Sequence, residues 1–169
     1  MAFKGIRLAA ALTLAGLAGG CFQPLYGPGL TGPRNAIGTI KVEPIPDHLG
    51  HQLKSELDFQ LNNGTPPENP VYRLKISDAK SNNLPVVADS AASRPQVMSF
   101  NVTANFTLED VKTGKVVTTG QASVQASFDR DMQRLATVRA LRDAEVRAAT
   151  QLAEQIRIRL MASLSGLRD

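Results

Sequence analysis

The chain has 169 residues, a length typical of one domain, and its single cysteine, Cys21, excludes an internal disulfide. Tryptophan is absent and aromatic residues are few, which argues against a groove lined with aromatic rings. The net charge of +4 falls to about +2 without the amino-terminal Lys4 and Arg7, since 17 basic residues then face 15 acidic ones, and so mild a charge does not indicate a nucleic-acid partner.

The first twenty residues have the order of an export signal. Residues 1–7 carry Lys4 and Arg7, residues 8–18 are almost all apolar, and two glycines precede Cys21. The apolar run is about eleven residues long, whereas a membrane-spanning helix needs roughly 20. We therefore predict a cleaved signal peptide over residues 1–20.

The end of this segment, residues 17–21, resembles a lipobox, the site where signal peptidase II cuts and where the cysteine receives lipid. Ala18 takes the place that most lipoboxes fill with leucine. One acyl chain binds a membrane only marginally and further chains make the anchor stable, so the resemblance implies that lipidated Cys21 anchors the protein. Phe22 stands where inner-membrane retention usually uses aspartate, which implies the outer membrane. The alternative is a plain signal peptide with an incidental cysteine.

Proline and glycine are frequent after the cysteine, which predicts a flexible tether over residues 21–35 and a folded domain over residues 36–165. Residues 37–42 are rich in β-branched side chains and predict a strand. A helix is expected to begin with Asp47 as its N-cap and to end at residues 62–64. Its apolar stripe repeats every four residues, at Leu49, Leu53, Leu57 and Leu61.

Three more strands are predicted by alternation of apolar and polar residues. The first surrounds Leu74, and it is followed by residues 78–95, which have little pattern and are expected to form a loop. Residues 99–109 alternate most regularly and return through a turn as residues 116–128, which predicts an antiparallel hairpin. Its polar side is rich in Thr, Ser, Asn and Gln and carries little charge.

The apolar period becomes helical over residues 136–164, with one stripe of leucine, isoleucine and alanine. The element order β-α-β-β-β-α therefore predicts an α+β fold, a small mixed four-stranded sheet with two helices packed on one face and the other face open. The order of the strands within the sheet does not follow from the sequence.

Residues for catalysis are not apparent. His48 and His51 are the only histidines, and a metal site at that spacing would need further ligands, so we predict two helix-surface histidines and no metal. Nucleophile motifs and phosphate-binding glycine loops are missing, which argues against an enzyme and against a cofactor other than covalent lipid. A binding function is the remaining interpretation. Arg94, Arg130 and Arg134 carry guanidinium forks that suit phosphate, although each one taken alone is more typical of a solvated surface charge.

Three segments together resemble the lipopolysaccharide-assembly lipoprotein family LptE in its alphaproteobacterial form. They are residues 21–27, the hairpin residues 106–115 and the terminal-helix residues 142–160. The resemblance implies a small sheet covered by two helices. It also implies a non-enzymatic protein at the periplasmic face of the outer membrane, which plugs the LptD β-barrel and interacts with lipopolysaccharide during export.

The resemblance implies lipopolysaccharide contacts as well. Arg94 stands in the loop where family members often carry an arginine, and Lys112 and Lys115 flank the hairpin turn. Together with Arg130 they are the candidate ligand-binding residues, and Cys21 is the candidate lipidation site. The alternative function is a free-standing periplasmic carrier that encloses a lipid in its own apolar cavity.

Overall fold

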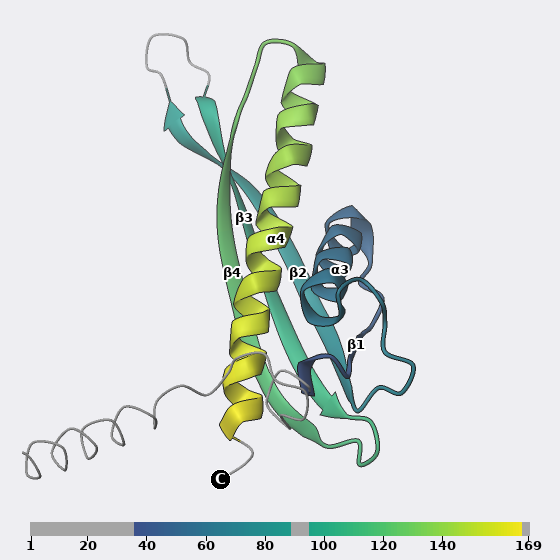
Figure 1. The fold of residues 1–169 in the computed structure, drawn as a ribbon. Helices are drawn as coiled ribbons and strands as arrows, with labels where there is room; N and C mark the ends of the chain where they lie inside the picture. Colours follow the sequence, from purple (N-terminus) through teal and green to yellow (C-terminus); the bar gives the residue numbers. More distant parts are fainter. Residues whose placement is uncertain (1–35, 89–94, 167–169) are drawn as a thin grey trace, which may run out of the picture. The chain divides into compact units, whose positions relative to one another are not determined.

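The computed structural model describes residues 36–88 and 95–166 (Figure 1). The elements follow one another as β1 (Ile40–Val42), α3 (Asp47–Asn62), β2 (Tyr72–Ala88), β3 (Pro95–Asp110), β4 (Val116–Asp129) and α4 (Arg134–Gly166). This is the predicted order of elements, so the predicted α+β class is confirmed. Within the described residues, no helix combines the length and the apolar character that crossing a membrane requires.

The four strands form one mixed sheet in the order β1-β2-β3-β4. The short β1 pairs parallel with β2, and the other two pairs are antiparallel. A parallel neighbour requires a crossover connection, and α3 supplies it between β1 and β2. The register keeps apolar residues in phase across β3 and β4, with Val102 opposite Val124 and Ala104 opposite Ala122. One face of the sheet is therefore apolar.

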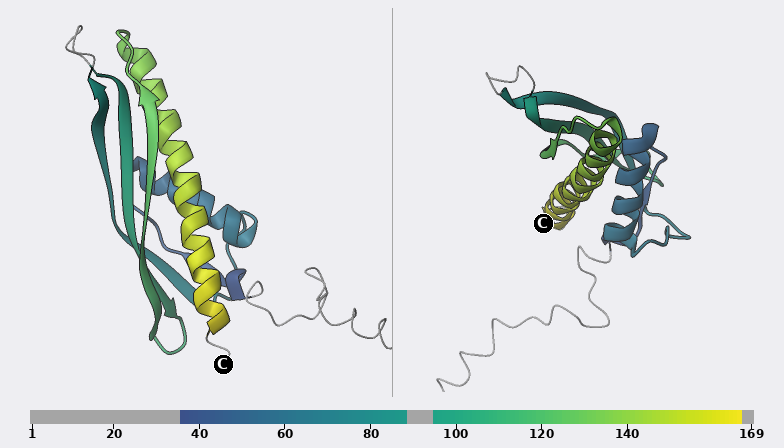
Figure 2. Two further views of the ribbon diagram at one scale, coloured as in Figure 1. Left: turned by 90° about the vertical axis from the view of Figure 1, so that its left-hand side faces the viewer. Right: turned by 90° about the horizontal axis from the view of Figure 1, so that it is seen from above.

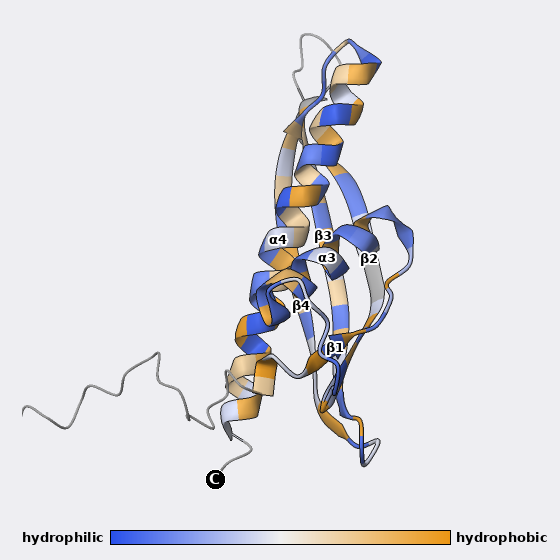
Figure 3. Cartoon of the chain, turned by 45° about the vertical axis from the view of Figure 1, so that its right-hand side comes forward, coloured by the Kyte–Doolittle hydropathy of each residue, from blue (hydrophilic) through white to orange (hydrophobic). Residues whose placement is uncertain are grey.

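Both helices cover that apolar face, and the other face of the sheet stays open (Figure 2). Leucines 49, 53, 57 and 61 of α3 are buried, as the four-residue period predicts. The stripe of α4 that is buried against the sheet and α3 contains four alanines, which allow α4 to approach closely: Ala144, Ala148, Ala149 and Ala153. Figure 3 shows hydrophobic and hydrophilic residues following one another along α4, as expected for a helix with one buried stripe.

The segment expected to be a loop, residues 78–95, is largely strand, and that prediction was wrong. β2 continues to Ala88 and β3 begins at Pro95, so the two strands form a long hairpin. Their pairing shifts register between Ser77 and Lys80 and again after Pro85. A bulge adds a residue to one strand and reverses the phase of its alternation, which explains why the sequence pattern breaks there.

The ends of two predicted elements also differ from the expectation. β1 starts at Ile40 because residues 36–39 form a turn in which Thr39 donates to the Ala36 carbonyl oxygen. Asp47 is the first helical residue of α3 rather than its side-chain cap, and its φ is +70°. The end of α3 agrees with the prediction, since Asn63 and Gly64 both take left-handed conformations.

Candidate functional site

The open face of the sheet carries short neutral side chains. The outward residues of β3 are Asn101, Thr103, Asn105 and Thr107, and those of β4 are Thr119, Gln121, Ser123, Gln125 and Ser127. The register sets them side by side, so that Asn101 lies opposite Gln125 and Asn105 lies opposite Gln121. The β4 residues are exposed and the β3 residues are half-buried by their neighbours. This arrangement is the polar hairpin side that the sequence predicted.

The side chains of this face leave many hydrogen-bonding groups available to a partner. Gln121 Nε2 donates to Asn105 Oδ1 over 3.0 Å, which joins the two strands at one point. An amide or hydroxyl both donates and accepts, so the rest of the face can match polar groups of either kind without a charge to desolvate. Charge appears at the end of the face, where Lys75 pairs with Glu109 at 2.8 Å.

Arg130 lies at the β4–α4 connection and is exposed, as the sequence predicted for this turn. The connection is ordered by hydrogen bonds: Asp131 Oδ1 accepts from the backbone N–H of Gln133 over 2.8 Å. Next to Arg130 stand two exposed apolar side chains, Met132 at 93% and Leu135 at 62% relative exposure. This end of the molecule therefore presents a cation beside apolar surface, a combination that suits an anionic amphiphile.

Lys112 and Lys115 lie on the β3–β4 turn and are both exposed. The turn is closed by backbone hydrogen bonds between Asp110 and Lys115 and between Gly114 and Asp110. Gly114 has a φ of +68°, a conformation that favours glycine. Asp110 Oδ1 accepts from the backbone N–H and the hydroxyl of Thr113, and these hydrogen bonds lower the pKa of the Asp110 carboxyl.

Among the candidate ligand-binding residues that the structure describes, Lys112 and Lys115 share one turn and Arg130 lies far from both. Lys115 and Arg130 stand at opposite ends of β4, roughly 45 Å apart for a strand of this length at about 3.3 Å per residue. They cannot contact one phosphate group at the same time. Arg94 and Cys21 lie outside the described residues, so their roles stay predictions.

The two histidines take positions on α3. His48 Nδ1 lies 3.1 Å from Glu145 Oε2 of α4, and the same carboxylate pairs with Arg142. His51 is exposed. Over residues 36–88 and 95–166, no group of three or more potential metal ligands occurs.

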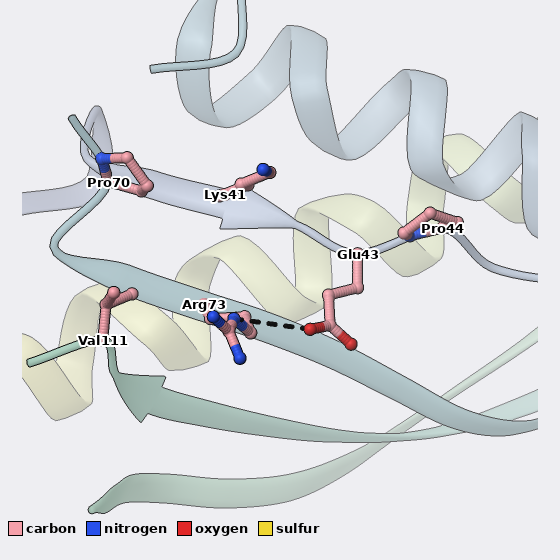
Figure 4. Close-up of a pocket in the computed structure, with 6 residues that line it drawn as sticks. All are labelled: Lys41, Glu43, Pro44, Pro70, Arg73 and Val111. Carbon is pink, nitrogen blue, oxygen red and sulfur yellow. Dashed lines mark ion pairs between the residues drawn. The ribbon is translucent and has the colours of Figure 1, made fainter. Parts of the chain in front are cut away.

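Sequence reasoning missed a group of charged residues at one end of the sheet. Lys41 on β1 is the register partner of Arg73 on β2, and Glu43 follows β1 (Figure 4). Arg73 Nε lies 3.4 Å from Glu43 Oε1. A helix and a loop separate Arg73 from Lys41 and Glu43 in the sequence, so only the parallel pairing of β1 and β2 reveals the group.

The fold and its faces define a class: a small sheet-and-two-helix domain with an open polar sheet face. The family model of LptE, described as lipopolysaccharide-assembly, matches residues 37–160. The chain therefore belongs to the LptE family, and this membership implies a lipoprotein involved in lipopolysaccharide assembly, within a family that is not enzymatic. No curated protein matches the chain at a significant level.

Solved structures with the same fold come from bacterial lipoproteins. A candidate lipoprotein of Caulobacter crescentus is similar with a TM-score of 0.66 and 23% identity, over 79% of this chain and 96% of that chain. The rare lipoprotein B of Shewanella oneidensis is similar with a TM-score of 0.58 and 12% identity, over 78% of this chain and 98% of that chain. These similarities establish the fold.

Proposed function

We propose that this chain is an outer-membrane lipoprotein that assembles with an LptD-type β-barrel, plugs its lumen and takes part in inserting lipopolysaccharide into the outer leaflet. It is anchored at the periplasmic face through lipid on Cys21, in line with the lipobox-like residues 17–21. It acts without catalysis and without any other cofactor. Membership of the LptE family supports the assignment to lipopolysaccharide assembly.

The observation that carries the plug is the open polar face of β3 and β4. The interior of a transmembrane barrel is polar, so a protein lodged there needs a surface of hydrogen-bonding groups. Neutral amides and hydroxyls provide such a surface, and they avoid the large cost of burying an unpaired charge. Gln125 and Ser123 lie exposed at the middle of this face.

The free-standing lipid carrier is less well supported. A carrier needs an apolar cavity of its own, whereas here the apolar face of the sheet is packed against both helices. Leu108 of β3, Leu57 of α3 and Leu152 of α4 are all fully buried in one core.

Co-purification tests the assembly. The full-length protein carries a photo-crosslinking amino acid in place of Gln125, and a control protein carries it in place of Glu68 in the exposed α3–β2 loop. Each protein is cross-linked in outer membranes and extracted in mild detergent. We expect a large β-barrel at about one-to-one stoichiometry and a higher cross-linking yield from Gln125. Recovery of the lipoprotein alone, under conditions that preserve other barrel complexes, would overturn the proposal.

The lipopolysaccharide contacts need a separate test, because Arg130 and the two lysines of the β3–β4 turn lie at different ends of β4. We propose that Arg94 and Arg130 contact lipid A phosphate, with Lys112 and Lys115 as further candidates. Arg130→Glu should weaken lipopolysaccharide binding by about tenfold, measured at low salt where screening is least, and Lys115→Glu measures the contribution of the opposite end. Unchanged binding by the folded Arg130→Glu protein would remove Arg130 from the site.

A further inference from the structure

A pocket of about 370 Å³ opens at the β1 end of the sheet, beside the β3–β4 turn (Figure 4). This volume is in the range of small-ligand sites. Its lining combines three charged residues with three apolar ones, and these are Lys41, Glu43, Pro44, Pro70, Arg73 and Val111. The charged side chains come from β1, β2 and the residue after β1, so a ligand here would be held by separate elements of the sheet.

The cations of the pocket are incompletely neutralised. Lys41 and Arg73 are register partners on adjacent strands, and like charges in that position repel each other. Glu109 stands opposite Arg73 on β3, but its carboxylate pairs with Lys75 at 2.8 Å. Glu43 approaches Arg73 through one Nε–Oε1 contact of 3.4 Å. Within the described part of the chain, Lys41 makes no ion pair, so the pocket lining keeps one net positive charge.

The arrangement of these charges suits a singly charged phosphate ester. Arg73 offers a planar fork and Lys41 a single ammonium group, and they approach from different strands. A phosphate ester can place one non-bridging oxygen at the arginine fork and the other at the ammonium group, and its single negative charge matches the net charge of the lining. The nearby carboxylate of Glu43 repels a second negative charge, which favours a monoanion over a dianion.

We propose that this pocket binds a phosphodiester, with its single negative charge between Lys41 and Arg73 and its organic substituents against Pro44, Pro70 and Val111. Such a group occurs in free glycerophosphodiesters and in the head groups of phospholipids. The proposal concerns a site at the β3–β4 turn end of the sheet, away from Arg130, and does not depend on binding to a barrel.

NMR titration of the isotope-labelled full-length protein in non-ionic detergent tests the site. The probes are dimethyl phosphate as the diester, methyl phosphate at pH 8 as the dianion, and dihexanoyl phosphatidylglycerol as the lipid form. We expect saturable amide shifts at Lys41, Glu43, Arg73 and Val111 with dimethyl phosphate, and weaker binding of methyl phosphate. Stronger binding of the lipid at the same residues would identify a phospholipid as the source, and equal binding would identify the diester alone.

Substitutions of Lys41 and Glu43 test separately the attraction and the repulsion that an anion meets in the pocket. Lys41→Gln should weaken dimethyl phosphate binding by about tenfold, while Arg139→Gln, which removes the same charge from an exposed position of α4 outside the lining, should leave it unchanged. Glu43→Gln should strengthen binding of the diester several-fold and admit methyl phosphate, a gain that a folding defect cannot produce. Equal affinities for the wild type, Lys41→Gln and Glu43→Gln would overturn the proposal.

Discussion

At the scale of single residues, a phenylalanine of β3 packs closely over a glycine of β4. Phe106 of β3 lies opposite Gly120 of β4, and a Cβ on Gly120 would meet the ring at 2.5 Å from Cζ. The ring is 3% exposed and enclosed by the core, so it has little room to move away. Glycine is needed at position 120 because an aromatic ring fills the place of its side chain.

Gly120→Ala should therefore lower the free energy of unfolding by roughly 1–3 kcal/mol through overpacking, as measured by chemical denaturation. The control is Gly166→Ala, because nothing lies within 4 Å of the Cβ that this substitution adds at the end of α4. The prediction fails if both variants are as stable as the wild type.

The carboxyl of Asp110 connects the stability of the β3–β4 turn to pH. Its pKa is lowered first by the hydrogen bond from the Thr113 backbone N–H and then by that from the Thr113 hydroxyl. A carboxyl with a lowered pKa in the folded state adds stability that is fully present above its unfolded pKa of about 3.9. That stability is lost as the pH falls through the folded value.

The variant Asp110→Asn removes this titration. We expect it to be less stable than the wild type at neutral pH, and the difference in unfolding free energy should shrink as the pH falls below about 4. Thr113→Val, which keeps the backbone donor and removes the hydroxyl, should show the same convergence with a smaller amplitude. A difference that is constant from pH 7 to pH 2 would contradict the assignment.

At the scale of elements, β4 is the last strand of the sheet and exposes one edge. Such an edge is a template for pairing with another chain. Arg147 of α4 donates to the carbonyl oxygen of Ser127 over 2.8 Å, and Arg159 donates to that of Gln121. Carbonyl groups two residues apart in a strand point the same way, so both arginines occupy the row of outward acceptors on β4.

Replacing both arginines should open this edge. We expect the double variant Arg147→Ala, Arg159→Ala to self-associate with increasing concentration, as measured by sedimentation velocity, while the wild type does not. Arg134→Ala, Arg139→Ala removes the same charge from exposed positions of the same helix and serves as the control. If the two double variants sediment alike, the arginines do not protect the edge.

At the scale of the whole molecule, the two faces of the sheet have separate tasks. The apolar face and the two helices form the core that holds the domain together. The polar face contributes little to that core and stays available for a partner. This division fits the proposed function, in which the core holds the domain together and the polar face meets the barrel.

The proposed lipid anchor on Cys21 makes its own prediction. Cys21→Ser should abolish the mass added by lipid, as seen by intact-protein mass spectrometry, and should move the protein from the membrane fraction to the soluble periplasmic fraction or leave it uncleaved. The folded domain should keep its circular dichroism spectrum, because Cys21 precedes residues 36–166. Retention of the lipid mass in the variant would exclude Cys21 as the lipidation site.

The sequence by itself determined the order of the elements, the apolar and polar faces, and the resemblance to the LptE family. These follow from local periodicity, such as the leucines of α3 and the alternation around Phe106, which neighbouring residues encode. Only the tertiary structure decided which strands are neighbours, how far β2 extends past its bulges, and which charged groups meet. Packing between distant segments brings Lys41 to Arg73 and Arg159 to Gln121. Such contacts depend on how distant segments align, which the pattern of neighbouring residues does not determine.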